Sequence, residues 1–414
     1  MRYKHISKTL LGLPLMLATF STVSLKANAA EPALSDLINN GKASINLRYR
    51  FEYVDQDGFA EEAESSTLRS RLTFKSGAYK GFSFLGEFDD LTVIGDDDYN
   101  STANGRTEFP VVADPTGTDL NQAFASFTNA GFTGSFGRQR VVHTNQRFIG
   151  GVAWRQNEQT YDGLRLQAKT DVGISFDYAY VYKINRIFGP DDGPVQPADH
   201  EGNSHFVLAN YKYSDNHTFR AFGYLLDIDE DTKYPAGRTV GNSSNTFGIE
   251  YVGKFAGNSL RASYAIQKDA GDSDLNYEAD YYVLEGGIKL GKANLTLGYE
   301  VLGADNGVGF KTPYATLHKF QGWADKFLVT PGDGIEDAYV GIKGAAGPVK
   351  LGAFYHTFSA EDSSADFGTE IDLVATWPAT KYLTLQLKFA SFSTDDEARF
   401  SDTDKVWLTV NFKL

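Results

Sequence analysis

The chain ends in a segment in which apolar and polar positions alternate strictly. In residues 406–414 every second position is apolar, and Trp407, Thr409, Asn411 and Lys413 fill the positions between. A period of two indicates a β-strand with one apolar and one polar face. Residues 45–53, near the other end, repeat the pattern. Each terminal strand leaves an edge that must pair, and pairing the two edges with each other closes a barrel.

Eighteen segments of this kind can be placed along the chain. The connections after even-numbered segments are short and rich in Gly, Asn, Asp and Ser, which suit tight turns, whereas several after odd-numbered segments are long. Short periplasmic turns and long extracellular loops are typical of outer-membrane barrels. We therefore predict an all-β fold, a transmembrane antiparallel up-and-down β-barrel. The predicted strands are 44–54, 67–76, 81–94, 119–128, 132–141, 159–169, 172–186, 203–213, 217–228, 245–255, 259–268, 277–290, 293–303, 335–344, 348–358, 367–378, 382–392 and 403–414.

Residues 1–29 have the pattern of a secretory signal peptide. Arg2, Lys4 and Lys8 precede an apolar stretch over 9–23, and Ala27 and Ala29 form an A-x-A cleavage site. A membrane anchor is the alternative, but the apolar stretch is shorter than the ~20 residues a spanning helix needs. We predict a signal peptide over 1–29 and a barrel over 30–414. The expected destination is the outer membrane of a Gram-negative bacterium, reached through the barrel assembly machinery, with lipid and lipopolysaccharide around the barrel.

Composition narrows the function. The formal net charge of −14 disfavours nucleic acid as a partner, and the absence of cysteine rules out disulfides and thiolate metal sites. Barrels of about 16–18 strands leave an aqueous channel, which makes transport the expected function. No nucleophile motif, phosphate loop or metal pair is evident, so we predict neither an enzyme nor a cofactor or metal site. The oligomeric state stays open.

Arginines on the polar faces are the candidate solute-binding residues. Arg48 and Arg50 lie on the first predicted strand and Arg69 and Arg71 on the second, so the four should cluster where guanidinium groups would hold carboxylates. Arg165 lies on the polar face of the sixth strand. The alternative is that these arginines pair with acidic residues of the lumen and only satisfy the wall.

Arg138 and Arg140 break the alternation of the fifth strand. Phe132 and Phe136 should face the lipid, and the same phase would turn both arginines outward, where charge is costly. Either a bulge at Gly137 resets the face or both arginines sit at the outer rim. We favour the bulge.

One connection differs from the others. Within 304–334, residues 311–327 are aromatic and basic and do not alternate, so this loop either folds into the bore or forms a surface lid. The outer loops are otherwise acidic, as at Asp55, Asp57 and 96–98, and these residues indicate a solvated rim.

Several segments resemble the bacterial alginate export family of outer-membrane channels. They include Gly-Arg-Gln-Arg at 137–140, the stretch 147–157 and the stretch 315–325. The resemblance implies an 18-stranded barrel whose arginine-rich lumen selects an anionic polysaccharide. Arg138, Arg140 and Arg155 match the family's arginine positions in these motifs.

We interpret the chain as a passive channel for polar, anionic sugar-like solutes such as uronates or oligosaccharides, which diffuse through a charged lumen. The alternatives are an export channel for alginate that works with a periplasmic secretion partner and a barrel-embedded hydrolase. The candidate substrate-binding residues are Arg48, Arg50, Arg69, Arg71, Arg138, Arg140, Arg155 and Arg165.

Overall fold

The computed structural model describes residues 33–414. The predicted signal peptide, residues 1–29, lies outside the described residues. A one-turn helix, α1 (Asp36–Asn39), precedes the first strand. Among the described residues, no helix is long and apolar enough to span a membrane.

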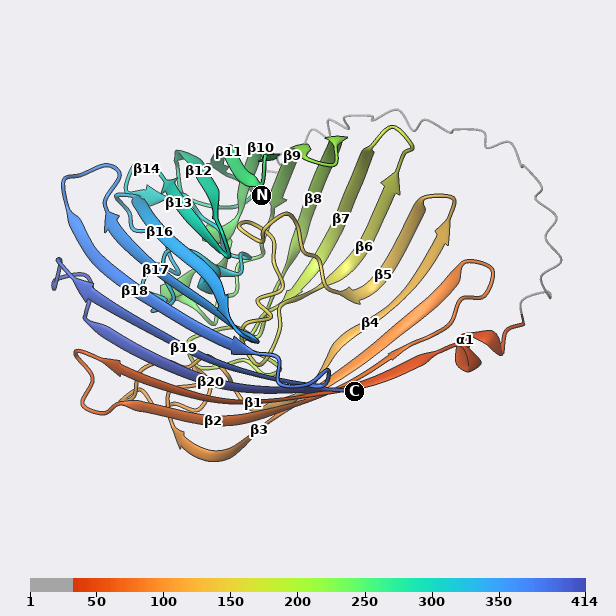
Figure 1. Cartoon of the computed structure of the whole chain (residues 1–414), viewed down its shortest axis with the longest axis horizontal. Helices are drawn as coiled ribbons and strands as arrows, with labels where there is room; N and C mark the ends of the chain where they lie inside the picture. The colour runs from red at the N-terminus through yellow and green to blue at the C-terminus, as the bar shows by residue number, and fades with distance from the viewer. Residues whose placement is uncertain (1–32) are drawn as a thin grey trace, which may run out of the picture.

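Eighteen antiparallel strands form one closed sheet (Figure 1). Each strand pairs with its neighbours in sequence, and β1 also pairs with β20, which closes the barrel. The barrel strands are β1 (Lys42–Gln56), β2 (Ala63–Lys75), β3 (Phe82–Asp98), β4 (Gly117–Asn129), β5 (Phe132–Gln139), β6 (Thr160–Lys169), β7 (Ile174–Asn185), β8 (Asp199–Ser214), β9 (His217–Leu226), β10 (Ser244–Phe255), β11 (Asn258–Asp269), β12 (Glu278–Leu290), β13 (Ala293–Leu302), β16 (Ile335–Ala346), β17 (Val349–Ser359), β18 (Asp366–Trp377), β19 (Leu383–Thr394) and β20 (Thr403–Lys413).

This architecture confirms the predicted fold class and all eighteen predicted strands. The connections also alternate as predicted, with short turns at one end of the barrel and long loops at the other. The long loops contain only short elements: the hairpin β14 (Ala304–Asp305) and β15 (Val308–Gly309), and the 3-10 turns η1 (Pro235–Gly237), η2 (Thr239–Asn242) and η3 (Leu317–Lys319).

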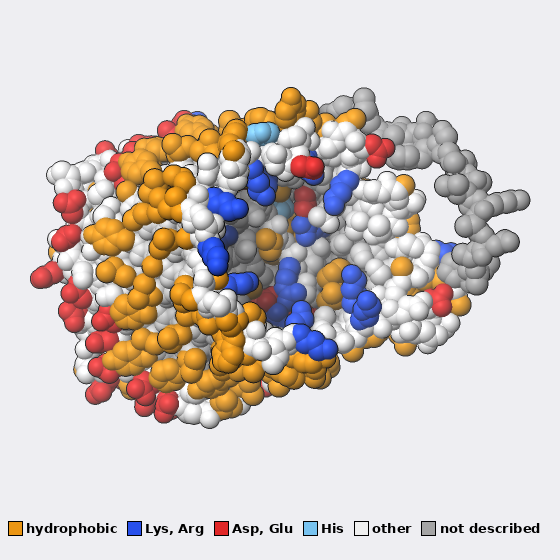
Figure 2. All heavy atoms as spheres, in the orientation of Figure 1, with side chains coloured by type: hydrophobic (Ala, Val, Ile, Leu, Met, Phe, Trp, Pro, Cys, Tyr) orange, Lys and Arg blue, Asp and Glu red, His pale blue; other side chains and the backbone are white. Residues whose placement is uncertain are grey.

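The two faces of the wall follow the alternation of the sequence. On β20, Leu408 is 38% exposed on the outside, whereas Trp407 on the inner face is fully buried. Apolar side chains cover much of the exterior on the face shown in Figure 2, and acidic side chains gather at the left end of the view. Only a membrane gives such an apolar exterior a favourable environment.

The predicted bulge at Gly137 is wrong. β5 pairs with both β4 and β6 without a register shift through Gly137, so Arg138 keeps the phase of Phe132 and Phe136. The register shifts instead in the neighbouring pairs, between Asp162 and Gly163 for example. No bulge is needed, because acidic side chains beside Arg138 at the outer end of the strand neutralise its charge.

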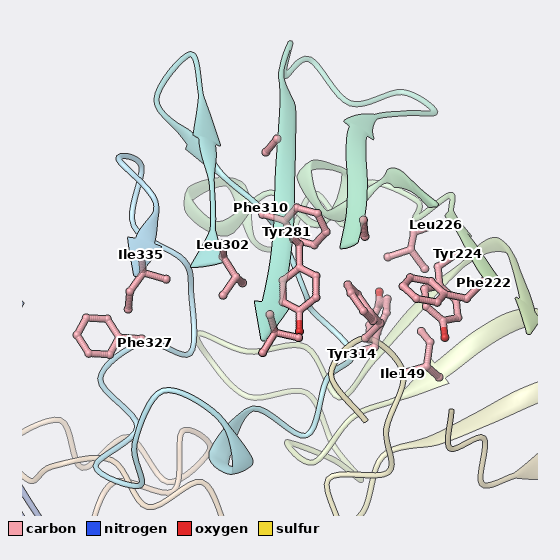
Figure 3. Packing of buried hydrophobic residues seen from close by; sticks show 14 of the residues in the cluster. Ile149, Phe222, Tyr224, Leu226, Tyr281, Leu302, Phe310, Tyr314, Phe327 and Ile335 are labelled. Carbon is pink, nitrogen blue, oxygen red and sulfur yellow. The ribbon is translucent and has the colours of Figure 1, made fainter. Parts of the chain in front are cut away.

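Two long loops, residues 140–159 and 303–334, fold into the bore. Phe148 of the first loop packs against Tyr281 of β12 and Phe310 of the second loop. These residues belong to a buried apolar cluster that joins the loops to the inner wall (Figure 3). The loop 303–334 is therefore an internal constriction and not a surface lid. We call the two inward loops together the plug.

Candidate functional site

The first loop of the plug is tied to the wall at strands β1 and β2. Gln156 Nε2 donates to Thr67 Oγ1 at 2.9 Å, and Arg48 Nε donates to Gln156 Oε1 at 2.8 Å. Arg155 Nη1 donates to Glu52 Oε2 at 2.9 Å. Hydrogen bonds between charged side chains and a carboxylate are among the stronger ones, so this part of the loop is held firmly.

The second loop is joined to the first by main-chain hydrogen bonds. The amide of Gly150 donates to the carbonyl of Tyr314 at 2.9 Å, and the amide of Thr316 donates to the carbonyl of Gln146 at 3.0 Å. The same loop is fixed to β18, because the Glu370 carboxylate accepts from the amide of Ala324 at 2.7 Å. The plug is thus one body with contacts on several strands.

An aromatic box lies where the two loops meet the wall. Lys388 Nζ of β19 is 4.0 Å from the ring centre of Trp154, 3.7 Å from that of Trp323 and 5.2 Å from that of Trp407. We call these four residues the tryptophan box. The Lys388 side chain packs against all three indole rings, so the box fastens both loops to β19 and β20.

His318 completes this contact between loop and wall. Its ring stacks on Trp154 with centroids 4.2 Å apart and planes 8° apart. Burial and then the adjacent Lys388 lower the pKa of His318 well below its usual range. The ring is therefore neutral: Nε2 accepts from Lys388 at 2.7 Å and Nδ1 donates to Asp325 Oδ1 at 2.8 Å.

Five of the eight candidate arginines form close ion pairs with carboxylates. The pairs are Arg71 with Asp89, Arg138 with Asp162, Arg140 with Glu87, Arg155 with Glu52 and Arg165 with Asp177. In these five arginines, pairing with acidic residues leaves fewer guanidinium donors free to bind a solute. A role in satisfying the wall, the alternative that the sequence left open, describes four of them well; Arg140 also keeps 31% of its side chain exposed.

The remaining three arginines lie close together, as predicted, on β1 and β2. Arg48 and Arg69 are directly opposite in the strand register, an arrangement that is unfavourable for like charges. Arg48 Nη1 donates to the carbonyl of Ala153 at 2.9 Å, and Arg69 Nη2 donates to Asn46 Oδ1 at 2.6 Å. Arg50 lies 4.2 Å from the ring centre of Trp154. These arginines thus hold the plug as well as line the bore.

Arg138 and Arg140 occupy different environments. Arg138 lies on the outward phase at the rim, where Nε donates to Asp162 Oδ1 at 2.9 Å and Nη1 to the carbonyl of Leu120 at 3.0 Å. Arg140 follows the last residue of β5 and turns inward, where it pairs with Glu87 and Glu158. Of these two arginines, only Arg140 faces the bore.

Glu158 is a buried carboxylate that closes the first loop onto the wall. It pairs with Arg71 Nη1 at 2.6 Å and with Arg140 Nε. Burial opposes its ionisation, but the two guanidinium groups outweigh burial and lower the pKa of Glu158 to about 2. The side chain is therefore ionised at any physiological pH.

An outer cavity of about 1100 Å³ lies on the loop side of the plug. Its charged lining consists of seven basic residues and one acidic residue, Asp325; the basic ones are Arg155, Arg186, Arg238, Lys311, Lys326, Arg399 and Lys405. Aromatic and aliphatic side chains, such as Phe188 and Leu317, fill much of the remaining wall. The cavity is thus basic and partly apolar behind an acidic rim.

Three of these cations have no carboxylate within 4.0 Å among the described residues. Arg186 Nη1 donates to Gln196 and to the carbonyl of Pro197, and Lys326 Nζ donates to Thr403 Oγ1 at 2.9 Å. Burial lowers the pKa of Lys311, while burial and then the neighbouring Lys405 lower the pKa of Lys326 to about 8. These groups retain charge for an incoming anion.

A second, smaller cavity of about 310 Å³ lies in the bore along β3–β6. Its lining includes Arg140 and Arg165 together with hydroxyl and amide side chains such as Ser135 and Gln167, and it shares no lining residue with the outer cavity. Residues of the loop 140–159 contribute to both cavities. The plug therefore stands between two polar compartments of one bore.

Several residues of this site could not be predicted from the alternation of the sequence. Glu158, Trp154, Arg186 and Lys326 lie in long connections whose side chains have no alternation to assign a face. The available signal was composition, since 140–159 contains three Arg and three Gln residues together with Phe148 and Trp154.

A closed 18-stranded barrel with an apolar exterior and a polar bore narrowed by inward loops defines a porin-like outer-membrane channel. Comparison with models of known protein families identifies the family of this channel. The family model described as alginate export matches residues 41–315, and the chain belongs to this family. Membership confirms the resemblance seen in the sequence, the integral outer-membrane location and the expectation of a channel and not an enzyme.

Solved outer-membrane structures share the fold. OccAB2 of Acinetobacter baumannii has 14% identity and a TM-score of 0.70, with 92% of this chain and 99% of that chain covered. OccAB4 of the same organism has 14% identity and a TM-score of 0.68, with coverage of 90% and 98%. OccK3 (OpdO) of Pseudomonas aeruginosa has 14% identity and a TM-score of 0.67, with coverage of 92% and 97%. A search of curated protein sequences finds no match.

Proposed function

We propose that this channel passes small anionic, sugar-like solutes, such as uronates and their short oligomers, by passive diffusion. The observation that carries the proposal is the lining of the outer cavity, with seven basic residues against one acidic residue. A cleft lined by one sign of charge between low-dielectric walls concentrates ions of the opposite sign. Because Arg186, Lys311 and Lys326 lack carboxylate partners within 4.0 Å among residues 33–414, their charge is available to a solute.

The route then leads past the plug. Arg48 donates to main-chain carbonyls of the loop and has no carboxylate within 4.0 Å in the described part of the chain, so a solute carboxylate would compete for its donors. Arg69 lies opposite it, and Arg140, 31% exposed, faces the inner cavity. We infer that these arginines form the anion path and that Arg50, Arg71, Arg155 and Arg165 mainly hold the plug and the wall. Arg138, at the outer rim, lies apart from this path.

The test is the reversal potential of single channels in planar bilayers under a salt gradient, followed by titration with uronate oligomers. We expect anion selectivity in the parent protein and its loss when Arg186, Lys311 and Lys326 are replaced together by Gln. The control variant removes the same amount of charge by replacing Arg106, Lys233 and Lys268 with Gln. These three residues do not line the outer cavity, so the anion selectivity should change little. Cation selectivity without block by uronates would refute the proposal.

The second candidate is export of an anionic polysaccharide with a periplasmic secretion partner. The family description favours it, and the same anion path would serve it. Export predicts that long polyuronates pass or block from the periplasmic side, whereas the first proposal predicts that only short oligomers pass. In either case we expect the barrel assembly machinery to insert the chain. The acidic rim at 96–98 would face lipopolysaccharide through bridging divalent cations.

A further inference from the structure

Lysines mark the short-turn end of the barrel. Eight strands carry a lysine among the three residues nearest this end: Lys42, Lys75, Lys169, Lys212, Lys254, Lys289, Lys350 and Lys413. All eight are exposed. Lys and Arg side chains gather around the hollow at the centre of the view, away from the acidic end (Figure 2). We call these eight residues the lysine ring.

The lysine ring lies on the inner phase of the wall. Along each strand, the lysine is an even number of residues from a side chain that faces the bore. Lys75 follows Arg71 by four residues, and Lys413 follows Trp407 by six. Since alternate residues of a strand share a face, the lysines point toward the mouth of the bore and not toward the surrounding lipid.

The charge of the lysine ring is largely uncompensated. Among the described residues, only Lys212 of the eight has a carboxylate within 4.0 Å, that of Asp215. The short turns and the residues before β1 contribute only three acidic residues between 33 and 414: Asp36, Asp171 and Asp215. The arginines deeper in the bore, by contrast, mostly sit beside carboxylates.

One pair in the lysine ring is directly unfavourable for the fold. Lys42 and Lys75 are directly opposite in the register of β1 and β2. Like charges at opposed positions destabilise a sheet. An arrangement that costs stability and is left without counter-charge suits an anionic ligand.

We propose that the lysine ring binds polyvalent anions at the periplasmic mouth, namely soluble chains that carry several carboxylates or phosphates. This proposal deepens the proposed function and rests on the passage of anions through the bore. Neighbouring strands are about 4.8 Å apart, so lysines on every second strand, as on β8, β10 and β12, are about 10 Å apart. Such spacing suits several charges along one chain better than a single small carboxylate. Membrane phospholipid does not fit, because the lysines face inward.

The test is block of the ion current by sodium tripolyphosphate, with sodium acetate as the monovalent comparison. Channels are inserted into planar bilayers in one orientation, and each salt is added to one side at a time. We expect tripolyphosphate to block at about tenfold lower concentration from the periplasmic side than from the outer side, and acetate not to block. Equal block from the two sides, or no block, would overturn the proposal.

Matched variants show which lysines cause the block from the periplasmic side. Replacing Lys42, Lys75 and Lys413 by Gln, on the adjacent strands β20, β1 and β2, should weaken periplasmic block about tenfold. A second variant, with Lys254 of β10, Lys289 of β12 and Lys350 of β17 replaced by Gln, should do the same and serves if the first variant assembles poorly. The control replaces the turn lysines Lys80, Lys292 and Lys381 by Gln; an equal loss of block in this control refutes the inward site.

The outcome separates this inference from the proposed function. A channel that is cation-selective yet blocked from the periplasmic side refutes the proposed function and leaves the ring as a site. A channel that is anion-selective but shows no sided block refutes the ring alone.

Discussion

Replacing Glu158 by Gln tests how the plug is held. The Glu158 carboxylate is 5% exposed and lies between Arg71 and Arg140. The two guanidinium groups outweigh burial and lower its pKa from 4.5 to about 2. A shift of this size corresponds to about 3 kcal/mol of stabilisation of the ionised, docked state.

The sign of this effect defines its pH range. Because the pKa of Glu158 is lower when docked, the stabilisation is fully present above about pH 4.5 and is lost as the pH falls toward 2. At pH 7 the Gln variant therefore lacks the whole of this stabilisation of the docked plug. The wall should remain intact, since Arg71 keeps Asp89 and Arg140 keeps Glu87 as partners.

Hydrogen exchange measures this loss directly. About 3 kcal/mol corresponds to exchange of the backbone amides of residues 150–159 that is roughly a hundredfold faster, provided that they exchange by local undocking. Single-channel recordings should show added current noise. The control is Glu61→Gln, which removes an exposed carboxylate of an outer loop. Unchanged exchange in residues 150–159, or faster exchange spread evenly over the barrel strands, would refute the reasoning.

Two further predictions follow from the outer cavity and from β5. Because the pKa of Lys326 is lowered to about 8, its ammonium loses its proton as the pH rises from 7 to 9. Anion selectivity, measured by reversal potential, should therefore fall over this range in the parent protein but not in Lys326→Arg. At Gly137 the backbone φ is +122°, and an added Cβ would lie 2.3 Å from the carbonyl oxygen of Ala123. Gly137→Ala should cost about 1–3 kcal/mol and lower the temperature at which the barrel unfolds on a gel, whereas Gly134→Ala, with contacts of 3.5 Å or more, should not.

A specific result would contradict each of these two predictions. A selectivity that falls equally with pH in Lys326→Arg would show that another group titrates. Equal melting of the two glycine variants would show that the conformation at Gly137 is not a constraint.

The barrel was predictable because alternation assigns a face to each residue of a strand. Arg48 and Arg69, predicted as neighbours on the first two strands, are directly opposite in the register. Arg138 was misplaced because alternation carries no information on depth: at the rim, beside Asp162, an outward arginine is tolerated.

The plug was harder to predict, because its contacts join residues far apart in the chain. Arg155 and Glu52 are 103 positions apart, and Gln156 and Thr67 are 89 apart. Neither loop has a periodic pattern that would indicate its partner. The composition of 311–327 indicated that this segment was unusual, but composition alone left both an internal and an external position open.

The attachment points of the plug have a consequence for how the channel matures. Its wall contacts include Arg48 and Glu52 on the first strand and Lys388 and Lys405 on the last two. The first and last strands become neighbours only when the sheet closes. The plug therefore reaches its full set of contacts only after closure. A barrel caught before that moment should be leaky, and the permeability barrier should be the last property that a newly inserted molecule acquires.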